Sequence, residues 1–248
     1  MSHSFQAVLK AAKSYIVGRN KVSENIPRII HQLWIPPAHL RAIPDDVLPQ
    51  VRAWKDSHPD FEHRLWTVEE VAANLSAPRA ARMMEAVRVS RFEAMKADIM
   101  RLYLLAEFGG FWSDLKVRPR RRWLDEYLDN DLVLVEHFRF DQLPDPSGTL
   151  TNNLIGSRAR NSFIEACIEK AHANIDARLS TSVWHVAGIK IYMDIYSDLC
   201  ARNAPPPRSR ILKSDYVWGE IVELGHGSYS SNHRHWSVRE KIESIYLE

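Results

Sequence analysis

The segment KADIMRLYLLAEFGGFWSDLKVRP, residues 96–119, constrains the fold more than any other part of the chain. It joins an amphipathic helical pattern, a glycine pair at 109 and 110, and a short apolar run that ends in Asp-Leu-Lys. Glycine tolerates the left-handed conformation in which many helices end, so the pair predicts a helix that turns directly into a strand. We expect Asp114 at the end of that strand and Lys116 at the next position on the same face.

Strand and helix patterns alternate along the rest of the chain. Short apolar runs bounded by proline, glycine or polar residues predict strands at 28–35, 62–67, 131–140, 152–157 and 211–219. Helical spacing and N-cap residues predict helices at 45–58, 67–75, 78–87, 162–174 and 182–199. This order predicts an α/β fold with a mixed, mostly parallel sheet that is flanked by helices.

The 248 residues suit one main domain with a short appendage. We divide them into an amphipathic N-terminal helix at 1–22 and one domain at 23–248, whose C-terminal tail is irregular. The basic helix either docks on the domain or lies on an anionic membrane surface. The sequence has no run of 18 apolar residues and no secretion-signal order, so we expect a cytoplasmic protein, peripheral on the inner face of the membrane if the helix binds lipid.

The net charge and the cysteine content limit the kinds of partner and metal site that the sequence predicts. The net charge of +2 argues against a nucleic-acid partner, although RPRRRW at 118–123 is locally basic. That stretch is either a solvated turn or a contact for anionic lipid or a phosphate-bearing acceptor. Cys167 and Cys200 form no C-x-x-C pair, so we expect two reduced thiols rather than a thiolate metal site.

Four side chains point to a shared pocket. In open α/β sheets, ligands bind beyond the carboxyl ends of the strands. Trp34 and Asp114 follow two such predicted ends. Asp98 and Arg101 are three residues apart on one face of the preceding helix, where they form either a solvated ion pair or part of the same pocket. Asp114 is either paired with a nearby cation or bound to a hydroxyl-rich ligand or a divalent ion.

Residues 96–119 resemble the sugar-nucleotide motif of the family-32 glycosyltransferases, the group with the DXD signature. The family pattern is a lysine- or serine-led Asp-Ile-x-Arg helix, a Gly-Gly turn, an aromatic residue and Asp-x-Asp. The segments IPRIIHQLWIP, WKDSHPDFEHRLWT and NNLIGSRARNSFIEACIE are similar to further parts of that family. The resemblance covers about residues 26–171 and resumes weakly at HRHWSV, residues 233–238.

This resemblance implies a single Rossmann-like GT-A domain. It also implies transfer of a hexose from a UDP- or GDP-linked donor to a glycan or glycolipid acceptor, with retention of anomeric configuration, in the synthesis of a surface polysaccharide, lipopolysaccharide or capsule. Trp34 would stack on the base, and Asp98 and Arg101 would hold hydroxyls of the donor sugar. Asp114 would hold ribose or sugar hydroxyls and help to bind a metal ion.

Further roles that the resemblance implies lie downstream. Asn153 would border the donor sugar. His233, His235 and Trp236 would lie where the family closes over the diphosphate. His31, in the first predicted strand, has no such role and is interpreted as a core histidine.

Lys116 departs from the family pattern, which has a second aspartate there as the principal ligand of Mn²⁺ or Mg²⁺. A protonated lysine cannot coordinate these ions, and three interpretations follow. Lys116 replaces the metal in part, by stabilising charge on the leaving diphosphate. Alternatively, Asp114 holds a metal with His233 or His235. In the third interpretation catalysis is lost, and the protein only binds a sugar nucleotide or glycan.

Overall fold

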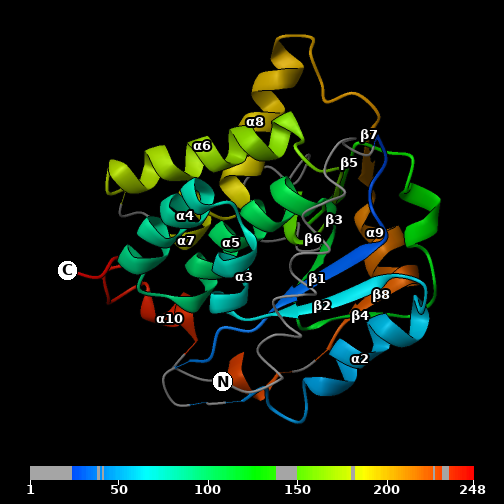
Figure 1. The fold of residues 1–248 in the computed structure, drawn as a ribbon, viewed down its shortest axis with the longest axis horizontal. Helices are drawn as coiled ribbons and strands as arrows, with labels where there is room; N and C mark the ends of the chain where they lie inside the picture. Colours follow the sequence, from blue (N-terminus) through cyan, green and yellow to red (C-terminus); the bar gives the residue numbers. More distant parts are fainter. Residues whose placement is uncertain are drawn as a thin grey trace, which may run out of the picture.

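The structure of this chain is a computed structural model that describes residues 24–37, 40, 42–137, 150–179, 182–225, 227–230 and 235–248. The predicted helix at 1–22 and the tail histidine His233 lie outside these residues. Helices and strands alternate along the chain, as the sequence predicts (Figure 1). No helix within the described ranges has the length and apolar character needed to cross a membrane.

A six-stranded sheet forms the centre, in the order β2-β1-β3-β6-β5-β7. Its strands are β1 (Ile29–Leu33), β2 (Glu62–Trp66), β3 (Gly110–Ser113), β5 (Leu132–Glu136), β6 (Leu150–Ser157) and β7 (Ser209–Leu212). β1 pairs in parallel with β2 and β3, and β5 pairs in parallel with β7. β6 runs antiparallel to β3 and β5, so its first residues reach the edge where β3 ends. The predicted mixed, mostly parallel sheet is confirmed.

Alternation along the strands sends apolar side chains to both faces of the sheet. In β3, Trp112 joins the larger hydrophobic cluster and Phe111 the cluster on the opposite face. The helices that contribute to the larger cluster are α3 (Val68–Asn74), α4 (Ala77–Val89), α5 (Glu93–Phe108), α6 (Ser162–Asp176), α7 (Val183–Val186) and α8 (Ile189–Ala201). The second cluster lies under α2 (Leu48–Ser57) and a two-stranded sheet of β4 (Val117–Pro119) and β8 (Val222–Leu224).

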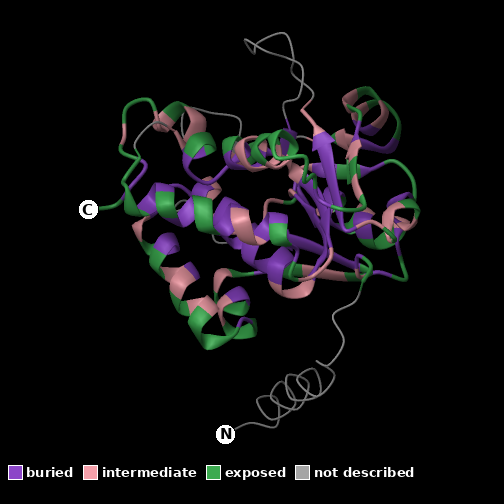
Figure 2. Cartoon of the chain, turned by 90° about the horizontal axis from the view of Figure 1, so that it is seen from above, coloured by how far each residue is buried: buried purple, intermediate pink, exposed green. Residues whose placement is uncertain are grey.

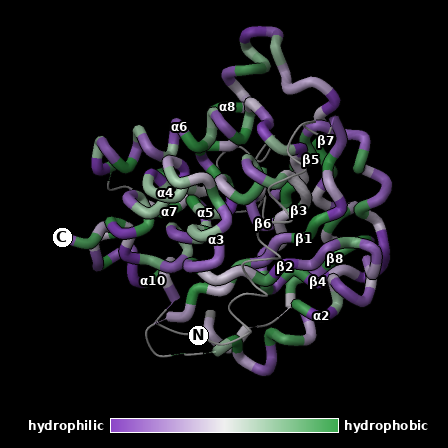
Figure 3. Tube along the Cα trace, viewed as in Figure 1, coloured by the Kyte–Doolittle hydropathy of each residue, from purple (hydrophilic) through white to green (hydrophobic). Residues whose placement is uncertain are grey.

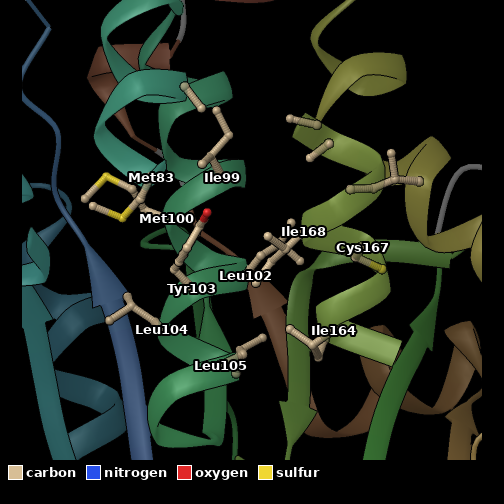
Figure 4. Packing of buried hydrophobic residues seen from close by; sticks show 14 of the residues in the cluster. Met83, Ile99, Met100, Leu102, Tyr103, Leu104, Leu105, Ile164, Cys167 and Ile168 are labelled. Atoms are coloured by element: carbon tan, nitrogen blue, oxygen red, sulfur yellow. The ribbon is translucent and has the colours of Figure 1, made fainter. Parts of the chain in front are cut away.

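The central helix α5 is buried on nearly every side. Its residues pack against α4 and α6, with Leu102 and Leu105 directed toward Ile164 and Ile168 (Figure 4). The outer helix α6 has hydrophilic and hydrophobic residues in alternation, as expected for a helix with one exposed face (Figure 3). Seen from above, the buried strands lie between helices that expose their outer faces (Figure 2).

The glycine pair forms the turn that the sequence predicts. Gly109 and Gly110 have φ values of 64° and 98°. A Cβ on Gly109 would lie 2.6 Å from the Ala159 amide nitrogen, so only glycine fits. The buried His31 imidazole accepts from Trp66 Nε1 (3.0 Å) and donates to the Gly109 carbonyl (2.7 Å). Burial lowers the pKa of His31 to about 3, so it is a neutral core residue, in agreement with its interpretation from sequence.

Two predicted strands need correction. Residues 110–117 are not one strand: the Val117 amide donates to the Asp114 carbonyl (2.9 Å), which makes a tight turn between β3 and β4. Lys116 is therefore in a turn and not on the same strand face as Asp114. Of the predicted strand at 211–219, only the first two residues are in β7, and α9 (Ser214–Tyr216) and η2 (Val217–Ile221) follow. There, Val217 and Ile221 pack into the second cluster at helical spacing.

The remaining short elements are η1 (Leu124–Tyr127), η3 (Ser228–Ser230) and α10 (Trp236–Arg239). The helix at 67–75 is predicted from its capping pattern, and α3 begins as expected. The Thr67 side chain accepts from the Glu70 amide, and the Glu70 carboxylate accepts from the Thr67 amide.

Candidate active site

Three charged side chains meet at the end of β3, and we call Asp98, Arg101 and Asp114 the charged cluster. Arg101 donates from one guanidinium nitrogen to Asp98 Oδ1 (2.8 Å) and from another to Asp114 Oδ1 (3.0 Å). Asp114 also accepts from Trp112 Nε1 (2.8 Å), and the Arg101 guanidinium lies 4.7 Å from the Trp112 ring centroid. Asp98 and Arg101 are thus not a solvated ion pair but the buried part of one site.

A short turn and a strand complete the surroundings of Asp98. Asn152, near the start of β6, donates to Asp98 Oδ1 (2.8 Å). Gly188, between α7 and α8, packs so closely that an added Cβ would lie 3.1 Å from Asp98 Oδ2 and 2.9 Å from the Trp184 Cα. Together with Arg101 of α5, the strand β6 and the turn at Gly188 therefore fix the Asp98 carboxylate.

Two carboxylates share one guanidinium, so the charged cluster has one negative charge in excess when both carboxylates are ionised. Burial raises the pKa of Asp98 to about 7, with Asp114 adding to the rise and Arg101 opposing it. Burial alone would lower the pKa of Arg101, but the two carboxylates outweigh it and keep the guanidinium protonated. Asp114 is half-exposed, with 38% of its side chain accessible, and it presents the cluster to solvent.

The charged cluster borders a cavity of about 820 Å³. Its lining includes every predicted site residue that falls within the described ranges, namely Trp34, Asp98, Arg101, Asp114, Lys116, Asn153, His235 and Trp236. The carboxyl ends of the parallel strands β1 and β3 bring Trp34 and Asp114 to one edge. The antiparallel β6 adds Asn153, whose carbonyl accepts from the Asp114 amide (2.9 Å).

Trp34 lies on one side of the cavity and is 8% exposed. Tyr229 meets its ring edge-on, with centroids 5.6 Å apart and planes at 85°. The Trp34 indole nitrogen is buried and has no hydrogen-bond partner among the described residues. A buried donor without a partner is costly, and here it is at the wall of a cavity that is large enough for a ligand.

Lys116 lies near Tyr229, the aromatic neighbour of Trp34, and near the tail residue His235. Its ammonium nitrogen is 6.0 Å from the Tyr229 ring centroid. Burial lowers the pKa of His235, and the charge of Lys116 adds to that effect. The Lys116 carbonyl accepts from the Gly225 amide (2.7 Å), which fixes the turn. A cation therefore stands where the DXD pattern has its second acid, and it lines the same cavity.

Among the residues that the structure describes, the side chains around the cavity do not suit a divalent metal ion. Within the described ranges, no group of three or more His, Cys, Asp or Glu side chains is arranged to hold one. One oxygen of Asp114 already accepts from Arg101 and Trp112. His235 hydrogen-bonds through Nδ1 to the Ser237 hydroxyl (2.7 Å), and the other candidate ligand, His233, lies outside the described residues.

Several site residues escaped the sequence reasoning. Asn152, rather than its neighbour Asn153, contacts Asp98, and the strand's direction could have suggested both. Trp184 and Tyr229 line the cavity but belong to segments without a recognisable motif. Only the number of tryptophans, eight, signalled that some of them were available for binding.

The basic stretch at 118–123 is largely neutralised by acidic neighbours. Arg121 pairs with Glu126 (2.9 Å), and Arg118 and Arg120 both pair with Glu223. Trp123, which ends the stretch, is 1% exposed and belongs to the core. The described contacts favour a structural turn over a surface for polyanions.

Comparisons with solved structures place the fold. The chain superposes on the PaToxG glycosyltransferase with a TM-score of 0.57 at 16% identity, covering 79% of this chain and 78% of that one. It also superposes on the UDP-bound glycosyltransferase domain of the YGT toxin with a TM-score of 0.54 at 9% identity, covering 82% and 84%. The fold is that of the GT-A glycosyltransferase domains.

Sequence comparisons find similarity to one group of glycosyltransferases over part of the chain. Residues 44–147 match the profile described as glycosyltransferase sugar-binding region containing DXD motif. Inositol phosphoceramide mannosyltransferase 2 of Schizosaccharomyces pombe is 29% identical over 149 residues, covering 60% of this chain and 39% of that protein. The mannosyl phosphorylinositol ceramide synthase CSH1 of Saccharomyces cerevisiae is 28% identical over 138 residues, covering 56% and 33%. The chain is therefore similar to DXD-motif glycosyltransferases in the region of its central motif, and it aligns with well under half the length of these relatives.

Proposed function

We propose that this protein is a retaining glycosyltransferase that moves a hexose from a nucleotide-diphosphate donor to a glycan or glycolipid acceptor. One observation supports this most strongly: Asp98, Arg101 and Asp114 converge on a cavity that also contains Trp34 and Lys116. Carboxylates suit sugar hydroxyls, an indole suits a base, and a cation suits a diphosphate. The names of the yeast relatives support a mannosyl donor and an inositol phosphoceramide-like acceptor.

In this proposal the charged cluster orients the donor sugar. Asp98 and Asp114 accept hydrogen bonds from its hydroxyls, and Arg101 holds both carboxylates in place. Because the cluster is already hydrogen-bonded before the donor binds, little reorganisation is needed at the reacting carbon. Trp34 stacks on the base, and Tyr229, which now meets its ring, moves aside when the nucleotide enters.

Lys116 stabilises the leaving group. When the bond from the anomeric carbon to the diphosphate oxygen breaks, negative charge grows on that oxygen. A new bond forms to the acceptor oxygen, whose proton passes to the departing diphosphate. A unit charge about 4 Å away contributes on the order of 4 kcal/mol at an effective dielectric of ~20, before desolvation costs. A lysine at this position supplies positive charge where the described residues offer no divalent-metal site.

The test is donor consumption over a panel of UDP- and GDP-linked hexoses, each assayed with EDTA and with Mn²⁺. We expect turnover of at least one donor that EDTA does not abolish. Asp98→Asn should reduce this turnover strongly, because it removes a charged acceptor from the sugar. Asp194→Asn is the matched control, because Asp194 is an exposed residue of α8 that pairs with Lys190. Turnover that vanishes with EDTA and returns with Mn²⁺ would contradict the role of Lys116.

A second function has one observation in its favour, the replacement of the family's second acid by Lys116. Under this alternative the protein binds a sugar nucleotide or glycan without transferring it. Calorimetric binding of UDP- or GDP-sugars without turnover, with or without metal, would establish it.

A further inference from the structure

The cavity has a second wall that the donor does not explain, formed by Trp184, Trp236, His137 and His235, which we call the aromatic notch. We propose that the aromatic notch is the acceptor subsite and binds the sugar ring that receives the transferred hexose. This inference rests on the proposed function and extends it to the second substrate. It assigns Trp236 to the acceptor and not to the diphosphate.

The two indole rings of the aromatic notch are inclined to each other. The ring centroids of Trp184 and Trp236 are 6.2 Å apart, and their planes meet at 59°. Trp184 is 44% exposed although it lines a cavity. A large aromatic side chain left accessible inside a concave site loses burial energy that a ligand can restore, so its exposure points to a binding surface.

The polar groups beside the two indoles fit a carbohydrate better than a lipid chain. His137 meets Trp184 edge-on, with centroids 6.4 Å apart, and His235 lies 5.5 Å from Trp236. A pyranose ring presents C–H groups on one face and hydroxyls around its edge. Indole faces match the first feature, and imidazole nitrogens match the second because each ring can donate or accept.

The aromatic notch is held next to the charged cluster by the turn at Gly188. This glycine packs against both the Trp184 backbone and Asp98 Oδ2, so α7 lies directly beside the carboxylate that is proposed to hold the donor sugar. An acceptor ring on Trp184 would therefore be adjacent to the anomeric carbon. Such proximity is what a transfer between two sugars requires.

Both ends of the four-residue helix α7 are braced. The Val183 amide donates to Glu240 Oε2 (3.0 Å), which links α7 to the residue that follows α10. Asn174 of α6 donates to the carbonyls of His185 (3.2 Å) and Val186 (3.1 Å). Trp184 and Trp236 are 52 residues apart in sequence but are held in one arrangement by these bonds. A preformed surface of this kind lowers the entropy cost of binding.

Fluorine NMR on the full chain labelled with 5-fluorotryptophan can test the assignment. The eight tryptophans give eight signals, and single Trp→Phe variants at 34, 184, 236 and 218 assign the informative ones. UDP and GDP are added first, and methyl glycosides of common hexoses are then titrated into the nucleotide complex. We expect nucleotide to shift the Trp34 signal and the glycosides to shift those of Trp184 and Trp236. Trp218, which packs on the second cluster, is the internal control.

The outcomes separate this inference from the proposed function. If nucleotide shifts Trp34 but no glycoside shifts Trp184 or Trp236, the acceptor subsite is wrong. If nucleotide alone shifts Trp184, the notch belongs to the donor, which also overturns the inference. A response to octyl glycosides but not to methyl glycosides would assign the notch to a lipid chain and contradict it as well. If no nucleotide shifts Trp34, the proposed function itself fails.

A transfer assay gives a second, independent readout. Trp184→Ala should raise the acceptor KM by about tenfold, the loss expected for one aromatic contact, while the donor KM changes much less. A merely structural role for Trp184 would affect both constants alike. Trp184→Phe should recover part of the acceptor affinity, because it restores an aromatic face.

Discussion

The two sides of the cavity are built in opposite ways. Most of the charged cluster is buried, and hydrogen bonds with side chains of α5, β3 and β6 hold its two carboxylates. The aromatic notch and Lys116 lie at more accessible positions, in short helices and turns. A residue of the first kind supports both the fold and the site, so its loss should affect stability and activity together. A residue of the second kind should affect activity alone.

The strongest test of this contrast is Arg101→Ala. It leaves two carboxylates without their shared cation, and breaking a buried ion pair costs about 3–5 kcal/mol. We expect a loss of that size in the free energy of unfolding, measured by urea denaturation, together with loss of donor turnover. Arg101→Lys keeps the charge but not the two-pronged geometry, so it should recover more stability than activity. If Arg101→Ala left the stability unchanged, the claim that the charged cluster supports both the fold and the site would be contradicted.

Replacement of Lys116 should lower activity and leave stability almost unchanged. Lys116→Ala should lower kcat by about 10²–10³-fold, the size expected for one electrostatic contact to a transition state. Its free energy of unfolding should change by no more than about 0.5 kcal/mol, because the position is a turn at the cavity wall. Lys190→Ala, which removes an exposed lysine from α8, is the control.

A substitution of Lys116 by aspartate tests whether the lysine takes the place of a metal ion. Lys116→Asp restores the family's second acid, and we expect it to be inactive with EDTA and partly active with Mn²⁺. The measurement is donor turnover across a metal titration. A wild-type enzyme that already requires Mn²⁺ would show that the lysine does not take the metal's place.

A smaller effect is expected from pH. The pKa of Asp98 is raised in the folded protein to about 7, from about 3.9 in an unfolded chain. The folded state therefore binds the extra proton more tightly, so this contribution to stability is complete below pH ~4 and is lost as pH rises toward 7. Asp98→Asn cannot titrate, so the wild type should lose stability relative to this variant across that range, measured by urea denaturation at each pH. Parallel curves would contradict the raised pKa.

The smallest effect should come from the exposed basic turn. Arg121→Ala removes surface contacts with Glu126 and the Tyr216 hydroxyl, and pairs of this kind contribute at most about 1 kcal/mol. We expect unchanged donor turnover and unchanged binding to anionic vesicles. Clear loss of vesicle binding would restore the membrane interpretation of residues 118–123.

Much of the candidate site could be predicted from local patterns. The glycine pair specified the turn after α5, and the three-residue spacing placed Asp98 and Arg101 on one face. The parallel arrangement of β1 and β3 brought Trp34 and Asp114 together, as expected from their places at strand ends. The position of Lys116 was misjudged, because nothing local distinguishes a continuing strand from the tight turn at Asp114.

The sequence by itself determined the alternation of strands and helices, the helix stop and the acidic and basic side chains of the charged cluster, because these depend on spacing and on the conformational freedom of single residues. Only the tertiary structure decided that Asn152, Trp184 and Tyr229 line the same cavity. Their segments carry no local signal of proximity. They are brought together by an antiparallel strand, a braced short helix and a turn near Lys116, and these contacts form only when distant parts of the chain pack.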